Sequence, residues 1–305
     1  MNIRKIMYKI NYSSRIFIAI VTMLILISSA YARTFQTTDN RFISYTDIGH
    51  GRPIVLIHAF PTDQRLWELA RKEIEDIFRD SYIFRIISID LWGFGQSSSI
   101  STNGQAITMA DYANEVNELL SSLDIKNAVI GGESMGGYVA LAFLEKFPQK
   151  VEGLILSSTQ SIADTLETKE KREATAVDVI EHGTEQLINE FILKALSPDT
   201  SEKSKLFLKH ILSKQDKMAI ASALRDMTLR HDTSNMLANT SLPILILAGE
   251  KDKIISPQQS QHMHALAKNS KLVIIPNAGH LLSLEQAHQW IWAVVAMFAE
   301  LETIK

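Results

Sequence analysis

The sequence of 305 residues contains no cysteine. This absence excludes thiol nucleophiles, disulfide bonds and zinc sites that use cysteine ligands. None of the nine histidines belongs to an H-E-x-x-H pair, the usual sequence pattern of a helical zinc site. A Walker loop and a complete G-x-G-x-x-G fingerprint are also missing, so the sequence gives no sign of a nucleotide site. We therefore expect neither a metal nor an organic cofactor.

The first 32 residues differ in composition from the rest of the chain. They carry Arg4, Lys5, Lys9 and Arg15 without any acid, then the apolar run IFIAIVTMLILIS, and end in AYA at Ala32. This order predicts a signal peptide (1–32), and the lack of a twin arginine favours the Sec route. The mature chain, 33–305, would then be periplasmic or secreted. A retained N-terminal membrane anchor is the alternative, but a stable span requires roughly 20 apolar residues, so we expect no stable anchor.

The predicted mature chain has no excess of positive charge. Cleavage would remove four of the 31 Lys and Arg and none of the 34 Asp and Glu, which leaves a formal net charge of −7. This charge argues against nucleic acid or an anionic membrane as the partner. The small-molecule partner that we expect is indicated by the motifs that follow.

Strand-like and helix-like segments alternate after residue 50. The apolar runs typical of buried strands are PIVLIH (53–58), YIFRIISID (82–90), NAVIGG (127–132), VEGLILSS (151–158), LPILILAGE (242–250) and KLVIIPNAGH (271–280). Helical patterns cover 62–78, 109–123 and 135–147, and the capping box S-L-E-Q predicts a last helix that starts at Ser283. This alternation predicts an α/β fold, a mostly parallel sheet flanked by helices. Residues from about 160 to 240 lack an apparent strand, and we expect about four helices there that form a lid.

Ser134 lies between a predicted strand and a predicted helix, in GGESMGGYVALAFLEKFP. The segment GESMG (132–136) matches G-x-S-x-G, in which small neighbours relieve crowding at a sharp strand-to-helix turn. The hydroxyl would project above the sheet at a helix N-terminus, where free N–H groups favour a developing negative charge. This setting favours a nucleophile over the other interpretation, a glycine-rich structural turn.

A serine nucleophile requires a base, and the base requires an acid that orients it. The segment GEKD, after a predicted strand, offers Asp252, and Glu250 is the competing acid. The segment PNAGH, after the last predicted strand, offers His280 as the base. Ser134, Asp252 and His280 therefore form the predicted triad.

The loop HAFP (58–61), after the first core strand, is expected to complete the site. Its N–H at Phe60 would bind an oxyanion together with the N–H of Met135. His58 ends the strand, and we interpret it as structural rather than catalytic.

Four stretches resemble the α/β-hydrolases of the esterase, enol-lactonase and cofactor-free haloperoxidase group. They are HAFP, DLWGFGQS (90–97), GESMGG and the pair GEKD and AGH, and they follow the family order between residues 54 and 280. The resemblance implies Ser134 as nucleophile, Asp252 as acid, His280 as base and a structural turn in DLWGFGQS. One departure is Ala59, where the family commonly has glycine. Dehalogenases and epoxide hydrolases of this fold carry aspartate at the position of Ser134, which argues against both activities.

The sequence therefore predicts an exported serine hydrolase that cleaves a carboxylic ester or lactone through an acyl-enzyme. One alternative keeps the triad and uses hydrogen peroxide in place of water, as a perhydrolase or haloperoxidase. Another is a catalytically silent hydrolase-fold protein that binds a ligand. The presence of all three triad groups argues against the silent alternative.

Overall fold

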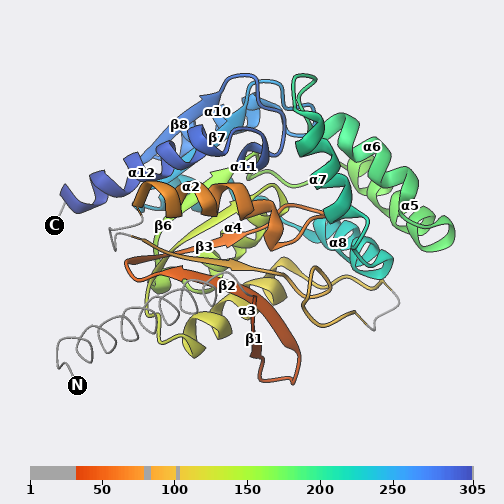
Figure 1. Ribbon diagram of the computed structural model, residues 1–305, viewed down its shortest axis with the longest axis horizontal. Helices are drawn as coiled ribbons and strands as arrows, with labels where there is room; N and C mark the ends of the chain where they lie inside the picture. The colour runs from red at the N-terminus through yellow and green to blue at the C-terminus, as the bar shows by residue number, and fades with distance from the viewer. Residues whose placement is uncertain (1–31, 79–83, 101–103, 304–305) are drawn as a thin grey trace, which may run out of the picture.

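The computed structural model describes residues 32–78, 84–100 and 104–303 (Figure 1). The predicted signal peptide, apart from Ala32, lies outside the described residues. Within them, eight strands form one sheet in the order β1-β2-β4-β3-β5-β6-β7-β8. The strands are β1 (Arg33–Gln36), β2 (Phe42–Gly49), β3 (Arg52–Ile57), β4 (Phe84–Ile89), β5 (Ala128–Glu133), β6 (Val151–Ser157), β7 (Ile244–Gly249) and β8 (Ser270–Ile275). Strands β3 to β8 are parallel and β1 and β2 pair antiparallel, so the predicted mostly parallel sheet is confirmed.

Both faces of the sheet are covered by helices. These are α2 (Glu68–Phe78), α3 (Met109–Ser122), α4 (Met135–Lys146), α10 (Pro257–Leu266), α11 (Leu282–Glu285) and α12 (Ala287–Thr303), with short 3₁₀ turns η1 (Gln64–Trp67) and η2 (Pro148–Lys150). In β3, Val55 and Ile57 join the core that contains α3 and α4, whereas Ile54 and Leu56 join the core that contains α2 and α12. Because successive strand residues point to opposite faces, a strand covered on both sides reads as a continuous apolar run.

The sequence analysis did not identify β1 and β2. In β1 three of the four residues are exposed, and β2 mixes apolar with polar residues in FISYTDIG. The polar positions of β2 are buried because other segments bond to them: Ser44 N donates to Ser97 Oγ, and Gln64 Nε2 donates to Ser44 Oγ. These partners are distant in sequence, so no local pattern marks the strand.

The predicted start of the last helix at Ser283 is wrong. Ser283 lies inside α11, whose N-terminal cap is Leu281, and α12 begins only at Ala287. The Ser283 hydroxyl donates to Glu133 Oε2 at 2.7 Å instead of capping a helix. Because Ser283 is already inside a helix, it cannot be the non-helical flanking residue that a capping box requires.

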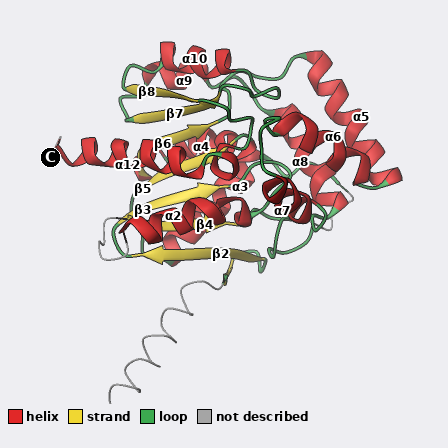
Figure 2. Cartoon of the chain, turned by 45° about the horizontal axis from the view of Figure 1, so that its top comes forward, coloured by secondary structure: helices red, strands yellow, loops and turns green. Residues whose placement is uncertain are grey.

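The segment between β6 and β7 contains five helices, where the sequence predicted about four. They are α5 (Leu166–His182), α6 (Glu185–Ala195), α7 (Glu202–Leu212), α8 (Lys217–Leu229) and α9 (Ser234–Asn239). Figure 2 shows α5 to α8 gathered at one end of the sheet. We call residues 158–243 the helical insertion.

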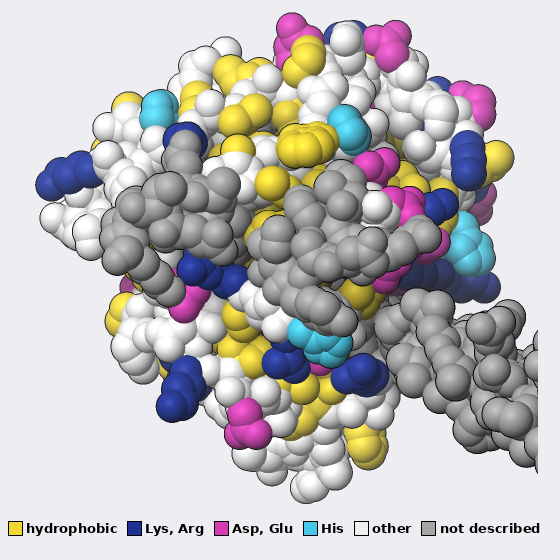
Figure 3. Space-filling model, turned by 60° about the vertical axis from the view of Figure 1, so that its left-hand side comes forward, with side chains coloured by type: hydrophobic (Ala, Val, Ile, Leu, Met, Phe, Trp, Pro, Cys, Tyr) yellow, Lys and Arg dark blue, Asp and Glu magenta, His cyan; other side chains and the backbone are white. Residues whose placement is uncertain are grey.

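No helix among residues 32–78, 84–100 and 104–303 has the length and apolarity that crossing a membrane requires. On the face drawn in Figure 3, acidic and basic side chains are spread among apolar and uncharged ones.

Candidate active site

Ser134 occupies the sharp turn between β5 and α4. Its backbone angles are φ 55° and ψ −113°, a conformation that non-glycine residues rarely adopt. The N–H of Ser134 donates to Ser157 O at 2.8 Å, and its carbonyl accepts from Thr159 Oγ1 at 2.8 Å. These bonds to the neighbouring strand hold the strained turn.

The two glycines of the G-x-S-x-G motif are required by close backbone approach. A Cβ on Gly132 would lie 2.1 Å from the carbonyl of Gly136. A Cβ on Gly136 would lie 2.0 Å from Ile57 O, at the end of β3. The first glycine therefore permits the tight turn, and the second brings the start of α4 against the HAFP loop.

Ser134, His280 and Asp252 form one hydrogen-bonded chain. The distance from His280 Nε2 to Ser134 Oγ is 2.8 Å, and that from His280 Nδ1 to Asp252 Oδ2 is also 2.8 Å. Asp252 Oδ1 accepts from the backbone N–H groups of Ile254 and Ile255, at 2.8 and 3.0 Å. The structure thus brings together the three residues that the sequence analysis selected from loops after β5, β7 and β8.

Glu250, the competing acid, lies elsewhere. Its Oε2 accepts from the backbone N–H of Asn277 at 3.0 Å, and its side chain is exposed. Its bond joins the loops after β7 and β8. The geometry therefore favours Asp252 as the partner of the histidine.

The surroundings of His280 favour its charged form. Burial alone would lower the pKa of His280, but the charge and hydrogen bond of Asp252, with Glu133 and Glu285 nearby, raise that pKa above its ordinary value. An imidazole that gains a proton easily suits a general base.

Glu285 ties the His280 loop to the helical insertion. Its carboxylate accepts from Gly279 N at 3.0 Å, from Ser197 N at 2.8 Å and from Thr200 Oγ1 at 2.6 Å. The backbone N–H of His280 also donates to Ala195 O, at 2.6 Å. The position of the base therefore depends on the end of α6 as well as on β8.

The two predicted oxyanion donors belong to residues near Ser134. Met135 is the first residue of α4, so its N–H has no acceptor within the helix. Phe60 lines the same pocket as Ser134 and His280. In the described part of the chain, neither backbone N–H donates to a loop, turn or side-chain acceptor. Ala59 adopts a negative φ, so the family's usual glycine is unnecessary there.

His58 and Asp90 bond to the backbone of neighbouring loops. His58 is buried, with Nδ1 3.0 Å from Ala59 O and Nε2 accepting from Leu91 N at 3.1 Å. Asp90, in DLWGFGQS, accepts from Gln64 N at 2.8 Å and from Gln96 N at 3.0 Å. Both residues shape the loops around the HAFP segment, as the sequence analysis expected for His58.

Glu133 is a buried acid that the sequence analysis did not single out. It accepts from the Ser283 hydroxyl at 2.7 Å and from the Ser157 hydroxyl at 3.2 Å. Burial raises the pKa of Glu133 to about 7, although these bonds and His280 oppose the shift. No local signal could have identified it, because its partners lie on β6 and α11.

A pocket of about 300 Å³ opens at Ser134 and His280. Its lining combines residues of the sheet loops with residues of the helical insertion: Phe60, Ser134, Tyr138, Gln160, Ile162, Ala163, Asp164, Thr165, Thr168, Arg172, Phe191, Met227, Ile254, Ile255, Gln259 and His280. The insertion thus supplies much of the surface that a substrate would contact.

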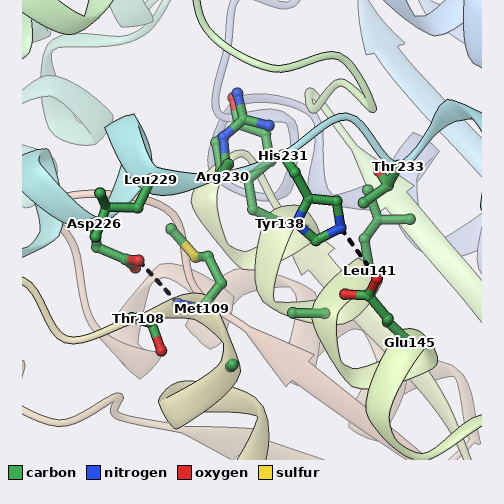
Figure 4. Close-up of a pocket in the computed structure, with 12 residues that line it drawn as sticks. Thr108, Met109, Tyr138, Leu141, Glu145, Asp226, Leu229, Arg230, His231 and Thr233 are labelled. Carbon is green, nitrogen blue, oxygen red and sulfur yellow. Dashed lines mark hydrogen bonds and ion pairs between the residues drawn. The ribbon is translucent and has the colours of Figure 1, made fainter.

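A second cavity, of about 140 Å³, is also lined by Tyr138 (Figure 4). Leu141 and Met109 give it a mainly apolar wall, and Asp226 accepts from Met109 N at 2.9 Å. None of the predicted site residues lines this cavity. In the described part of the chain, no three His, Asp or Glu side chains are grouped to hold a metal ion.

Comparison with known proteins identifies the family. A family model described as alpha/beta hydrolase fold matches residues 52–179 and 187–287. The chain belongs to the alpha/beta hydrolase fold family. A relative of this hydrolase, the AB hydrolase superfamily protein YisY of Bacillus subtilis (strain 168), is 30% identical over 285 residues, which cover 87% of this chain and 97% of the relative.

Solved structures of hydrolases share the fold over nearly their whole length. A thermophilic esterase from Thermogutta terrifontis, solved with malate bound, has a TM-score of 0.82 and 30% identity. The match covers 89% of this chain and 99% of the esterase chain. An enol-lactonase from Burkholderia xenovorans LB400 has a TM-score of 0.77 and covers 88% of this chain and 100% of that chain. Its identity is 20%, so it shows the common fold alone. The predicted resemblance of this hydrolase to the α/β-hydrolases of the esterase, enol-lactonase and cofactor-free haloperoxidase group is confirmed.

Proposed function

We propose that this hydrolase cleaves a carboxylic ester or lactone through a covalent acyl-enzyme on Ser134. The observation that carries the proposal is the hydrogen-bonded chain from Ser134 Oγ through His280 to Asp252, with both distances at 2.8 Å. The family membership and the 30% identity to a solved esterase support the choice of an ester bond.

In the first half of the reaction Ser134 becomes acylated. His280 Nε2 takes the hydroxyl proton while Ser134 Oγ attacks the carbonyl carbon, and Asp252 stabilises the imidazolium through Nδ1. The N–H groups of Phe60 and Met135 bind the oxyanion of the tetrahedral intermediate. The ester C–O bond then breaks, and His280 returns its proton to the departing alkoxide.

In the second half water removes the acyl group. His280 takes a proton from water, the resulting hydroxide attacks the acyl carbon, and the Ser134 ester bond breaks. The proton on His280 returns to Ser134 Oγ, so the free enzyme and a carboxylic acid are formed. A lactone gives the corresponding hydroxy acid by the same steps.

The helical insertion acts as the lid in this proposal. Thr168 and Arg172 of α5, Phe191 of α6 and Met227 of α8 line the pocket with Ser134. A lid of this kind would exclude water and select the substrate.

The proposal is tested with a panel of 4-nitrophenyl esters and lactones of varied acyl length, using residues 33–305. The Ser134→Ala variant should lose turnover by several powers of ten, because no other group can take over the attack. The exposed Ser121, whose hydroxyl donates to Asn117 O within α3, offers a matched control as Ser121→Ala. Equal turnover by wild type and Ser134→Ala would show that Ser134 is not the nucleophile.

A further inference from the structure

Two arginines pair with one buried acid, Asp164, which lines the pocket together with the first of them, Arg172. Arg172 Nε donates to Asp164 Oδ2 at 2.7 Å, and Arg230 Nη2 donates to Asp164 Oδ1 at 2.8 Å. The Asp164 side chain is only 1% exposed, so both of its oxygens are shielded from solvent. Two guanidinium groups and one carboxylate give this cluster of Arg172, Arg230 and Asp164 a formal charge of +1.

The two arginines differ in how fully they are bonded. Arg230 also donates to Ile162 O at 3.0 Å, and its guanidinium lies 3.8 Å from the centre of the Tyr138 ring. Arg172 lines the pocket, and its side chain is 21% exposed, against 6% for Arg230. Among the described residues, Arg172 makes one hydrogen bond, from Nε, so both of its terminal nitrogens can still donate.

The lining of the pocket offers no acid that would neutralise this surplus. Asp164 is the single carboxylate among the described lining residues, and each of its oxygens already accepts from an arginine. The carboxylate of Asp252 is hydrogen-bonded to His280. A guanidinium with free terminal N–H groups matches the planar geometry of a carboxylate, which it can bind through two parallel hydrogen bonds.

We infer that the substrate is an ester or lactone with a second, free carboxylate, which Arg172 binds while Ser134 attacks the ester carbonyl. This inference rests on the proposed function and names the substrate class of the same site. Thr165 and Thr168 line the same pocket, and their neutral hydroxyls carry no charge that would oppose an anion. An uncharged ester would leave the terminal N–H groups of Arg172 without an anionic partner, because only Nε is bonded to Asp164.

The inference is tested by comparing esters of matched length on residues 33–305. Mono-4-nitrophenyl glutarate is paired with 4-nitrophenyl pentanoate, and the corresponding adipate with the hexanoate, after subtraction of the rate with Ser134→Ala. We expect kcat/KM to be on the order of 10-fold higher for at least one carboxylate ester than for its neutral partner. This preference should shrink when the salt concentration rises from about 0.05 to about 0.5 M, because salt screens a partly exposed charge.

Variants on α5 distinguish the specific effect of Arg172 from the effect of positive charge elsewhere on the helix. Arg172→Gln should lower kcat/KM for the carboxylate ester on the order of 10- to 100-fold more than it lowers kcat/KM for the neutral ester. Lys171→Gln removes the same charge from the adjacent exposed position and should leave the preference unchanged. Arg172→Lys keeps the charge without the planar fork and should retain part of the preference.

Two outcomes would overturn the inference while the proposed function stands. One is equal hydrolysis of carboxylate and neutral esters by the wild type, and the other is an equal loss for both esters in Arg172→Gln. If the wild type hydrolyses none of the esters, both proposals fail.

A measurement on the wild type covers the case in which Arg172→Gln does not fold. Glutarate should inhibit hydrolysis of the neutral ester at a concentration about 10-fold lower than glutaramide, its uncharged analogue. Equal inhibition by the two compounds would contradict the inference.

Discussion

Asp252 has the geometry to act as the orienting acid, and Glu250 is two residues away in the same loop. Asp252 bonds to His280 Nδ1 at 2.8 Å, whereas Glu250 bonds to the backbone of Asn277 at 3.0 Å. Asp252→Asn should lower kcat by about 10⁴-fold, because the amide favours the wrong tautomer of His280. Glu250→Gln removes one acid from the same loop and should remain within about threefold of wild type, since a surface bond contributes little. A large loss of kcat in Glu250→Gln together with a nearly normal kcat in Asp252→Asn would show that Glu250, and not Asp252, is the orienting acid.

The protonation of His280 should govern the dependence of activity on pH. His280 must be neutral to accept the proton of Ser134, and its pKa is raised above the ordinary 6.5. The value of kcat/KM should therefore fall in acid, with a midpoint above 6.5, and reach a plateau at higher pH. In Asp252→Asn the residual activity should show a lower midpoint, because the carboxylate no longer favours the imidazolium. A wild-type rate that stays constant from about pH 8 to about pH 5 would exclude histidine as the base.

At the scale of elements, the contact between α4 and the end of β3 positions the oxyanion donors. A Cβ on Gly136 would lie 2.0 Å from Ile57 O and 2.8 Å from His58 O, both of which are backbone atoms. Gly136→Ala should force α4 and the HAFP loop apart. We expect a loss of folding stability of a few kcal/mol, roughly as for other overpacked sites, together with at least a ~10²-fold loss in kcat.

Gly183 provides the matched control for Gly136. It follows α5 with φ 91°, and no atom lies within 4 Å of a Cβ built there. Gly183→Ala should reduce the free energy of unfolding by about 1 to 3 kcal/mol through backbone strain alone and leave kcat unchanged. The two variants are compared by chemical denaturation and by ester turnover. Normal turnover in a folded Gly136→Ala would show that this contact does not position the donors.

Local patterns explain which elements could be predicted. The elbow at Ser134 was predictable because a strand, two glycines and an apolar helix are adjacent in sequence. Asp252 and His280 were predictable because each follows a strand that ends at the same edge of the sheet. β1 and β2 were not predictable, because the polar residues of β2 depend on partners such as Ser97 and Gln64.

Long-range contacts explain the remaining errors. Ser283 matched a capping box in sequence, but it lies inside α11, and its hydroxyl donates to the distant buried carboxylate of Glu133. The pairing of Arg172 and Arg230 with Asp164 joins segments up to 66 residues apart, and no local sequence pattern predicts it. The residues that shape the pocket are therefore visible only once the insertion is folded against the sheet.

At the scale of the whole molecule, buried carboxyls make stability depend on pH. Burial raises the pKa of Asp226 to about 8 and that of Glu115 to about 7. Asp226 Oδ1 accepts from Met109 N, which joins α8 to α3, and Oδ2 has no partner in the described residues. The unfolded chain ionises Asp226 near its ordinary pKa of 3.8, whereas the folded chain keeps the proton up to about pH 8. The stability that the protonated form contributes is therefore lost as pH rises between these values.

Asp226→Asn isolates this contribution from those of the other titrating groups. The amide oxygen can still accept from Met109 N and carries no proton that titrates. The free energy of unfolding of wild type, relative to Asp226→Asn, should fall steadily from about pH 5 to about pH 8. Denaturant titrations of both proteins across this range measure the difference. A difference that is constant or rises with pH would contradict the raised pKa.

Covalent labelling of the nucleophile tests the central claim most directly. A fluorophosphonate reacts with a serine whose hydroxyl is activated by a neighbouring base, so the label reports the proposed chemistry without a known substrate. A protein of residues 33–305 is incubated with the probe and then digested. The labelled peptide is sequenced by mass spectrometry. The account predicts one label per chain, on Ser134, with none in Ser134→Ala and much slower labelling in Asp252→Asn. A label on another serine, or an unlabelled wild-type protein that is folded, would contradict it.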